Sequence, residues 1–347
     1  MKILVTIPEG VVKDTFLPTD VREALSALGD VHYNDLGRQY TREELANALC
    51  GVEIVVTGWG TPGITGEVLK GCDALTLIAH TGGSVADLVD CGTYEKGIRV
   101  ISGNKLYAES VAEGTIAYMT AMMRRIPDYV QQTRCGGWRM PKGDYTEGLF
   151  GRTIGILGVG AIAKNLMQML KPFRCTFLVW DDNYTVDPDY LASVNARQTT
   201  LEEVLSSCSV ISLHASLTEK SVGLIGKREF LMMPKGALFL NTARGAIVRE
   251  SEMIEALQER QDLRAVLDVF EKEPVDSDSP LRSMENVYLM PHMGGPTVDH
   301  RAAVGRALVS DIHKLLCGET MEHEIGAAAA FRMTSHTKVN QIMKEKK

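Results

Sequence analysis

The sequence has no excess of positive charge and no hydrophobic run long enough to cross a bilayer. Its 347 residues carry a formal net charge of −7, whereas a nucleic-acid-binding surface needs a basic patch. No apolar run approaches the roughly 20 residues that a spanning helix requires. The opening segment, MKILVTIPEG, has strand character and a single lysine, unlike a secretory signal. We therefore expect a soluble cytoplasmic protein that binds neither nucleic acid nor a membrane.

Paired cysteines and metal-binding histidine motifs are also missing. The seven cysteines are scattered, without a C-x-x-C pair, which is typical of reduced thiols in a cytosolic protein. No two of the eight histidines form an H-x-x-x-H or H-E-x-x-H pair, so no metal site is expected. The length favours two domains over one compact core.

Short apolar runs of strand length alternate with segments of helical period along most of the chain. The expected strands form two series, the first at 2–7, 53–58, 74–79 and 97–102, and the second at 153–158, 176–181, 210–214, 237–242, 264–269 and 287–291. Continuous apolar strands joined by helices predict parallel sheets covered on both faces. Six strands in the second series match a doubly wound dinucleotide-binding domain.

Two long helices and a polar tail complete the expected elements. An Ala- and Met-rich helix is predicted over 108–126, and an amphipathic helix over 297–318. The tail, 327–347, is rich in alanine and then polar and basic. We interpret this tail as a frayed or peripheral extension.

A glycine-rich turn lies between the first strand and helix of the second series. The segment GILGVGAIAKNL contains Gly158, Gly160 and Ala163 at G-x-G-x-x-A spacing. In such turns the first glycine makes the tight bend, the second lets a pyrophosphate approach, and the third position must be small. The next strand ends at Asp181, where an acid can bind the ribose hydroxyls, and no arginine is near to meet a 2′-phosphate. An ordinary strand-to-helix turn is the alternative, but the combination favours NAD.

Polar residues follow the later strands of the same series, where ligands of such sheets bind. Arg244 can clamp a carboxylate with two parallel hydrogen bonds. His292 can pass a proton to a carbonyl oxygen, and a neighbouring carboxylate such as Glu273 favours its protonated form. Asp268 could instead bond the nicotinamide amide, and Glu271 reads as a solvated surface acid. Singly each of these residues could be ordinary surface charge or a structural contact, but together they predict hydride-transfer chemistry.

At this point the chain resembles the D-isomer-specific 2-hydroxyacid dehydrogenases. The segments that carry the resemblance are GILGVGAIAKNL, LHASLTEKSVGLIG, FLNTARGAIV, LDVFEKEP and LMPHMGG, in the family's order. The resemblance implies an α/β fold with two doubly wound parallel-sheet domains. These are a flavodoxin-like substrate domain, 1–103 plus 297–347, and a Rossmann NAD-binding domain, 104–296. It further implies a homodimer, with the helix from 108 in the interface.

The resemblance also implies roles for individual residues. Arg244, Glu273 and His292 would be catalytic, as substrate-binding arginine, orienting acid and proton donor. The expected NAD contacts are Gly158, Gly160, Ala161, Ile162, Asp181, His214, Thr218, Thr242, Ala243, Asp268 and Gly295. The substrate carboxylate would bind Arg244 and the backbone amides of Gly83 and Ser84. His80 would either contact the substrate or cap a strand end, and Trp138 would either reach a neighbouring subunit's active site or be an ordinary buried tryptophan.

The loop AHTGGSVADLVD (79–90) departs from the family's A-G-V-G pattern, with Ser84 at the second glycine. The substrate's side chain therefore stays open among glyoxylate, hydroxypyruvate, phenylpyruvate and sugar acids. A non-catalytic NAD-sensing protein is the alternative function, although a sensor has no use for a proton donor. A formate dehydrogenase is a second rival, but the resemblance implies glutamine there at the position of Glu273.

Overall fold

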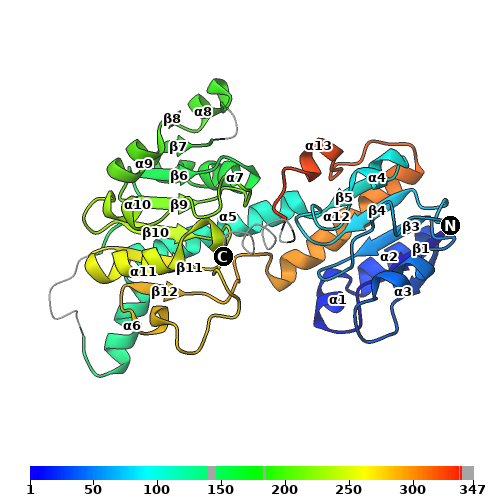
Figure 1. Ribbon diagram of the computed structural model, residues 1–347, viewed down its shortest axis with the longest axis horizontal. Coiled ribbons are helices and arrows are strands. Elements are labelled where there is room, and N and C mark those ends of the chain that lie inside the picture. The colour runs from blue at the N-terminus through cyan, green and yellow to red at the C-terminus, as the bar shows by residue number, and fades with distance from the viewer. Residues whose placement is uncertain (139–145, 183–184, 336, 338–347) are drawn as a thin grey trace. The chain divides into compact units, whose positions relative to one another are not determined.

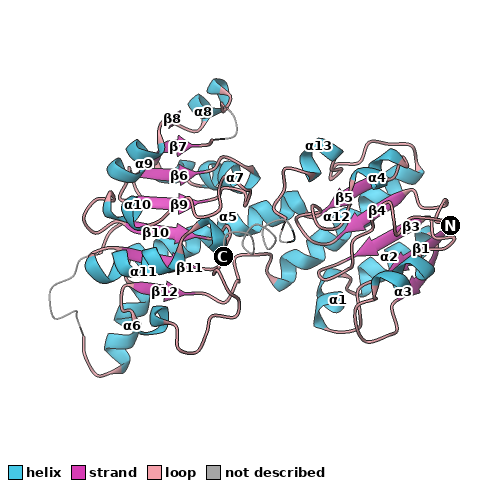
Figure 2. Cartoon of the chain, in the orientation of Figure 1, coloured by secondary structure: helices cyan, strands magenta, loops and turns pink. Residues whose placement is uncertain are grey.

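The computed structural model describes residues 1–138, 146–182, 185–335 and 337. The chain forms two compact units, Met1–Ala108 with Pro296–Lys347 (unit 1) and Glu109–Gly295 (unit 2). Each unit has its own parallel sheet (Figures 1 and 2). The predicted α/β class is confirmed. In the described part of the chain, no helix is both long and apolar enough to span a bilayer.

Unit 1 contains a five-stranded parallel sheet in the order β2-β1-β3-β4-β5, which is the flavodoxin-like order. Its strands are β1 (Lys2–Val5), β2 (Asp30–Tyr33), β3 (Ile54–Thr57), β4 (Leu77–His80) and β5 (Arg99–Ser102). Successive residues of β4 point to opposite faces: Leu77 and Ala79 join one apolar cluster, and Ile78 joins the other. Both faces of the sheet are therefore buried.

Helices cover the two faces of this sheet. Those of unit 1 are α1 (Val11–Phe16), α2 (Thr19–Leu28), α3 (Arg42–Ala48), α4 (Cys91–Glu95), α12 (Val298–Leu316) and α13 (Ala327–Ala330). The face with Leu77 packs against apolar residues of α1, α2 and α12, such as Phe16, Leu25 and Leu308. The opposite face packs against α3 and α13. The long amphipathic helix predicted near the C-terminus is confirmed as α12.

The first part of the tail packs against unit 1, so its interpretation as a peripheral extension is wrong there. Ala330 is fully buried in the cluster behind β4. Ser84 Oγ donates to the carbonyl oxygen of Thr334 at 2.8 Å, and Ser335 Oγ donates to Asp87 at 2.6 Å. The loop that follows β4 is therefore fixed by residues about 250 positions later in the chain. The end of the tail, 338–347, lies outside the described residues.

Unit 2 contains a seven-stranded parallel sheet in the order β12-β11-β10-β9-β6-β7-β8. Its strands are β6 (Thr153–Leu157), β7 (Thr176–Trp180), β8 (Ala196–Gln198), β9 (Val210–Leu213), β10 (Leu238–Asn241), β11 (Arg264–Leu267) and β12 (Val287–Leu289). The strands β8-β7-β6-β9-β10-β11 follow the Rossmann order, and β12 is added next to β11. The predicted number of six strands is wrong, because β8 pairs with β7 at the edge.

Helices of unit 2 are α5 (Asn104–Met123, which begins in unit 1), α6 (Ile126–Arg134), α7 (Ala161–Met169), α8 (Pro188–Ser193), α9 (Leu201–Ser207), α10 (Lys227–Leu231) and α11 (Glu250–Glu259). The helix predicted over 108–126 corresponds to α5, which begins earlier, at Asn104, and ends earlier, at Met123. Arg125 adopts a left-handed φ of 55° before α6. Pro127 is tolerated only in the first turn of a helix, so a new helix begins there.

Candidate active site in a dinucleotide-binding unit

The glycine turn lies at the point where the strand order of unit 2 reverses, between β6 and β9. Sheets of this type bind ligands beyond the carboxyl ends of the strands at that point. Gly158 has a φ of 91°, and a Cβ there would lie 2.5 Å from the backbone N and Cα of Ala215. Glycine is therefore required, because the turn packs directly on the loop that follows β9.

Gly160 is in a different environment. It precedes α7, and a Cβ at this position would meet no atom within 4 Å. The turn is fastened by Asp181, whose Oδ2 accepts the amide of Val159 at 2.7 Å, and Ala163 is fully buried behind it. Ala161 and Ile162 form the first turn of α7. Open space above a helix N-terminus fits a pyrophosphate.

His214 and Thr218 lie in the segment that follows β9. Burial lowers the pKa of His214 to about 4, so the ring is neutral near pH 7. Its Nε2 bonds Ser212 Oγ at 2.8 Å, and its buried Nδ1 has no partner among the described residues. Thr218 Oγ1 is engaged with Ser221 in a local turn. A buried ring nitrogen without a partner leaves a hydrogen bond for a ligand.

Glu273 and His292 form the hydrogen-bonded pair that the sequence predicts. His292 Nδ1 lies 2.7 Å from Glu273 Oε2, and the other carboxylate oxygen accepts the amide of Phe270 at 3.0 Å. The carboxylate is thus fixed at both oxygens, and it orients the imidazole through Nδ1. Since Nδ1 faces the acid, Nε2 is the ring nitrogen free to exchange a proton with a ligand.

Arg244 follows β10 and is brought beside Glu273 by close packing of two loops. A Cβ at Gly245 would lie 1.9 Å from the carbonyl carbon of Phe270, so only glycine permits this contact. Burial lowers the pKa of Arg244, and the charge of Glu273 opposes that change. Arg244 Nε is buried without a partner among the described residues. Nη1 donates to the carbonyl oxygen of Ala243 at 2.5 Å, so Nε is the buried donor left for an anionic ligand.

Asp268 makes contacts that the sequence did not predict. Its two carboxylate oxygens accept the amides of Met293 and Gly294, each at 2.7 Å. Burial raises the pKa of Asp268, and these two amide bonds oppose the rise. The carboxylate therefore fixes the loop that carries His292, which adopts a left-handed φ of 55°. A contact of Asp268 with the nicotinamide stays a prediction.

Helix α5 supports the same loops, a role that the sequence did not predict. Thr115 Oγ1 lies 3.2 Å from Thr242 Oγ1, beside the buried Ala243. Tyr118 donates its hydroxyl to Asp268 at 3.3 Å. Gly114 lies next to Gly294, where a Cβ would come within 3.7 Å. Polar residues and a glycine inside an otherwise apolar helix were the available signal.

The remaining candidates fall in two places. Gly295 lies in the loop after His292, and a Cβ there would meet no atom within 4 Å. His80, Gly83 and Ser84 belong to unit 1 and not to unit 2. Trp138 is 79% exposed, so the interpretation as a buried tryptophan is wrong.

In unit 1 the loop after β4 presents unused backbone donors. The amides of Gly83 and Ser84 bond no acceptor within the described ranges. His80 Nδ1 bonds Thr57 Oγ1 on the neighbouring strand at 2.9 Å. Burial lowers the pKa of His80 to about 4, and Gly82 lies over its Nε2. This geometry favours the strand-end role for His80 over a substrate contact.

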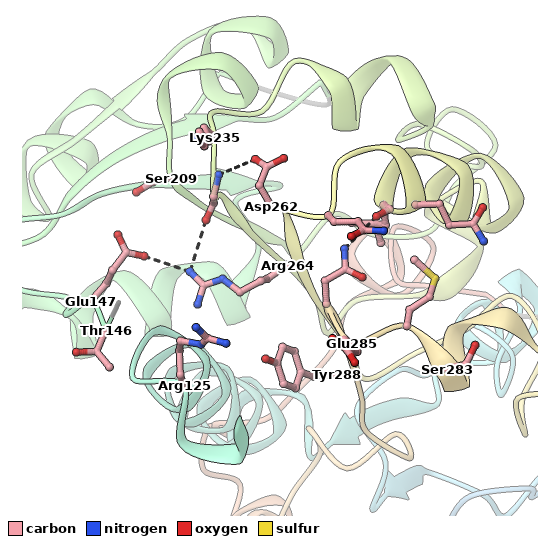
Figure 3. Close-up of a pocket in the computed structure, with 16 residues that line it drawn as sticks. Arg125, Thr146, Glu147, Ser209, Lys235, Asp262, Arg264, Ser283, Glu285 and Tyr288 are labelled. Atoms are coloured by element: carbon pink, nitrogen blue, oxygen red, sulfur yellow. Dashed lines mark hydrogen bonds and ion pairs between the residues drawn. The ribbon is translucent and has the colours of Figure 1, made fainter. Parts of the chain in front are cut away.

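A cavity of about 1170 Å³ opens at the other edge of the unit 2 sheet. Three of its lining residues, Ser209, Lys235 and Arg264, precede or begin strands of this sheet (Figure 3). Arg264 there bonds Glu147 at 3.1 Å. None of the candidate residues lines this cavity, so it is separate from the chemistry at the carboxyl edge.

A Rossmann sheet with this turn defines a dinucleotide-binding protein. A model of the D-isomer specific 2-hydroxyacid dehydrogenase NAD binding domain matches residues 116–294. The D-3-phosphoglycerate dehydrogenase of Methanocaldococcus jannaschii is 30% identical over 94% of this chain and 59% of its own length. The formate dehydrogenase of Neurospora crassa is 31% identical over 77% of this chain and 74% of its own length.

Solved structures agree with these relatives. The apo-structure of D-lactate dehydrogenase from Escherichia coli has a TM-score of 0.71, with 25% identity over 94% of this chain and all of the other. The chain therefore belongs to the D-isomer-specific 2-hydroxyacid dehydrogenase family, and its NAD-binding domain lies in unit 2. It spans 52 to 59% of the phosphoglycerate dehydrogenases it matches.

Proposed function

We propose that the protein is an NAD-dependent dehydrogenase that interconverts a D-2-hydroxy acid and its 2-oxo acid. The observation that carries the proposal is the His292–Glu273 pair at 2.7 Å, next to Arg244 with its buried, unpartnered Nε. A proton donor beside an anion-binding cation suits reduction of a carbonyl next to a carboxylate. Unit 1 is proposed as the substrate domain.

Each residue has one task in this reaction. Arg244 and the amides of Gly83 and Ser84 hold the substrate carboxylate. Bound NADH would supply a hydride to C2 of the 2-oxo acid. His292 passes the proton on Nε2 to the carbonyl oxygen, which completes the hydroxyl group, and then regains a proton from solvent. Glu273 orients the ring through Nδ1. The helix from 108 is proposed to contribute to a homodimer.

The rival functions do not use this pair. A non-catalytic NAD sensor needs no proton donor at the site. Formate oxidation releases carbon dioxide and a hydride without moving a proton from an oxygen, so an acid–base pair has no task in it. Similarity to a formate dehydrogenase nevertheless makes formate a necessary member of any substrate panel.

The proposal is tested by following NADH absorbance with a panel of 2-oxo acids, and NAD reduction with formate. We expect oxidation of NADH by at least one 2-oxo acid. His292→Ala should lower kcat by about 10²- to 10⁴-fold, the usual contribution of a general acid, while the NADH dissociation constant stays unchanged.

His32→Ala is the matched control, because His32 is an exposed histidine that also bonds an acid, Asp30, at 2.8 Å. It should leave turnover unchanged. Tight NADH binding without oxidation by any 2-oxo acid would instead support the NAD-sensing function. Reduction of NAD by formate would support a formate dehydrogenase.

A further inference from the structure

The carboxyl edge of the unit 1 sheet holds an aromatic cluster beside the loop after β4. Trp59 follows β3, the strand that pairs with β4. Its ring packs edge-on against Phe16 at 5.2 Å and against Tyr107 at 6.3 Å between centroids. Trp59 is nevertheless 42% exposed. We refer to Trp59, Tyr107 and Arg301 as the Trp59 cluster.

This cluster is continuous with the loop that carries the unused amides. A Cβ at Gly83 would lie 3.3 Å from the ring of Tyr107. The hydroxyl of Thr81, a fully buried residue of the same loop, has no hydrogen-bond partner in the described part of the chain. An enclosed hydroxyl without a partner leaves a hydrogen bond for a ligand.

Arg301 brings a positive charge to this edge. It lies in the first turn of α12, with its guanidinium 5.2 Å from the ring of Trp59 and 5.8 Å from that of Phe16. Its Nε donates to the carbonyl oxygen of Pro296 at 3.2 Å. Within the described residues its terminal nitrogens bond no acceptor, and no carboxylate lies within ion-pair distance. Arg306, farther along the same helix, is paired with Asp20.

A stacked guanidinium with two free amino groups is a site for an anion, because the stacking fixes its plane and leaves its donors unused. The N-terminus of α12 adds a partial positive charge beside it. The amides of Gly83 and Ser84 already offer a place for one carboxylate of the substrate. The Trp59 cluster lies next to them, on the far side of Tyr107.

We propose that Arg301 binds a second anionic group, at the end of the substrate opposite its 2-oxo acid carboxylate. The protein then prefers 2-oxo acids with a distal carboxylate or phosphate to those with an uncharged side chain. This inference rests on the proposed function and names its substrate class. Trp59 and Phe16 are positioning residues whose rings hold the guanidinium, and Tyr107 packs against Trp59.

The test compares wild-type protein with Arg301→Gln, using substrates that differ in the distal group. Oxaloacetate and 2-oxoglutarate carry a distal carboxylate, 3-phosphohydroxypyruvate a phosphate, 2-oxopentanoate neither, and phenylpyruvate a ring. We expect the highest kcat/KM for one of the first two kinds. Arg301→Gln should lower it by about 10- to 100-fold, mainly through KM, as loss of a charge-assisted hydrogen bond does. The loss should be smaller with 2-oxopentanoate.

Two comparisons make the result decisive. Arg301→Lys should recover part of the lost activity, since it restores the charge without the planar fork. Arg306→Gln, which removes an exposed arginine from the same helix, should behave as wild type. A preference for phenylpyruvate or 2-oxopentanoate, or an equal loss with every substrate in Arg301→Gln, would overturn the inference.

Calorimetry separates failure of this inference from failure of the proposed function. If no 2-oxo acid oxidises NADH, the proposed function fails, and binding of 2-oxoglutarate is still measured. Binding that is weakened at least about tenfold in Arg301→Gln supports the anion site. Absence of 2-oxoglutarate binding to the wild-type protein, or equal binding to wild type and Arg301→Gln, contradicts the anion site.

Discussion

At the scale of single residues, the candidate chemistry depends on hydrogen bonds that restrict the orientation of Glu273 and His292. Glu273 is bonded through both carboxylate oxygens, to the amide of Phe270 and to His292. The loop with His292 is fixed in turn by the buried carboxylate of Asp268. Such preorganisation would hold the proposed proton donor in place without reorganisation during the reaction. The effect of each contact can therefore be measured separately.

Glu273→Gln tests the orienting acid. The glutamine oxygen can still accept the Phe270 amide, so the fold should be retained, but the carboxylate oxygen that orients the imidazole through Nδ1 is lost. We expect kcat for 2-oxo acid reduction to fall at least about tenfold, with the NADH dissociation constant unchanged. Asp30→Asn removes the acid of the exposed His32 pair and should have no effect. An unchanged kcat in Glu273→Gln would show that the pair is not catalytic.

The two glycines of the turn should respond in opposite ways to alanine. Gly158→Ala places a methyl group 2.5 Å from the backbone of Ala215 at a φ of 91°, so we expect a loss of about 2 kcal/mol or more in the free energy of unfolding. Gly160→Ala meets no neighbouring atom, and stability should change by less than about 0.5 kcal/mol.

Gly160→Ala should nevertheless weaken NADH binding at least about tenfold, because the methyl group occupies space that the pyrophosphate needs. Urea unfolding and fluorescence titration with NADH measure the two effects. Unimpaired NADH binding by Gly160→Ala would place the pyrophosphate elsewhere.

At the scale of elements, two buried histidines end strands and make stability depend on pH. His80 ends β4 and His214 follows β9, and burial lowers the pKa of each to about 4, against about 6.5 in an unfolded chain. Between these values the unfolded state binds more protons, so stability should fall as the pH drops from about 6.5 to about 4. Each histidine contributes up to about 1.4 kcal/mol per pH unit, and nothing above pH 6.5.

The check is urea unfolding at a series of pH values for wild-type protein, His80→Asn and His214→Asn. Each substitution should reduce the slope between about pH 6.5 and 4, whereas His32→Asn at an exposed position should preserve it. Parallel curves for all four proteins would contradict the assignment.

The central elements were predictable, and the edge elements were not. Strands such as β9 and β10 are buried along their whole length, so they read as continuous apolar runs. By contrast β2 and β8 lie at sheet edges with exposed or half-buried residues, and their polar sequences carry no such signal. Their pairing comes from neighbouring strands, which a local pattern does not contain.

The same distinction applies to the candidate site. Arg244, Glu273 and His292 follow strands at the carboxyl edge, and strand order brings them together. Asp268, by contrast, bonds the amide of Met293, which is 25 residues away in the sequence. It also bonds the hydroxyl of Tyr118, which is 150 residues away. Only the three-dimensional packing of α5 against this edge reveals them. The bond from Ser84 to Thr334 is unpredictable for the same reason.

At the scale of the whole molecule, the chain leaves unit 1 once and returns to it once. The segment 109–295 has its own apolar core, which runs from Ala112 in α5 to Val266 in β11. Unit 1 is completed only when α12 and α13 add to its two faces. The continuous unit should therefore fold without the discontinuous one.

We predict that a fragment of residues 104–295, which keeps α5 whole, unfolds cooperatively in urea and binds NADH. Every expected NAD contact lies within this range, and so does the His292–Glu273 pair. The fragment should nonetheless oxidise NADH with no 2-oxo acid, because it lacks the amides of Gly83 and Ser84 that are proposed to hold the substrate. Binding of NADH within about tenfold of the full chain, measured by fluorescence, would show that the cofactor site belongs to unit 2. A folded fragment that does not bind NADH would mean that unit 1 contributes to the cofactor site, and turnover by the fragment would remove unit 1 from the proposed substrate site.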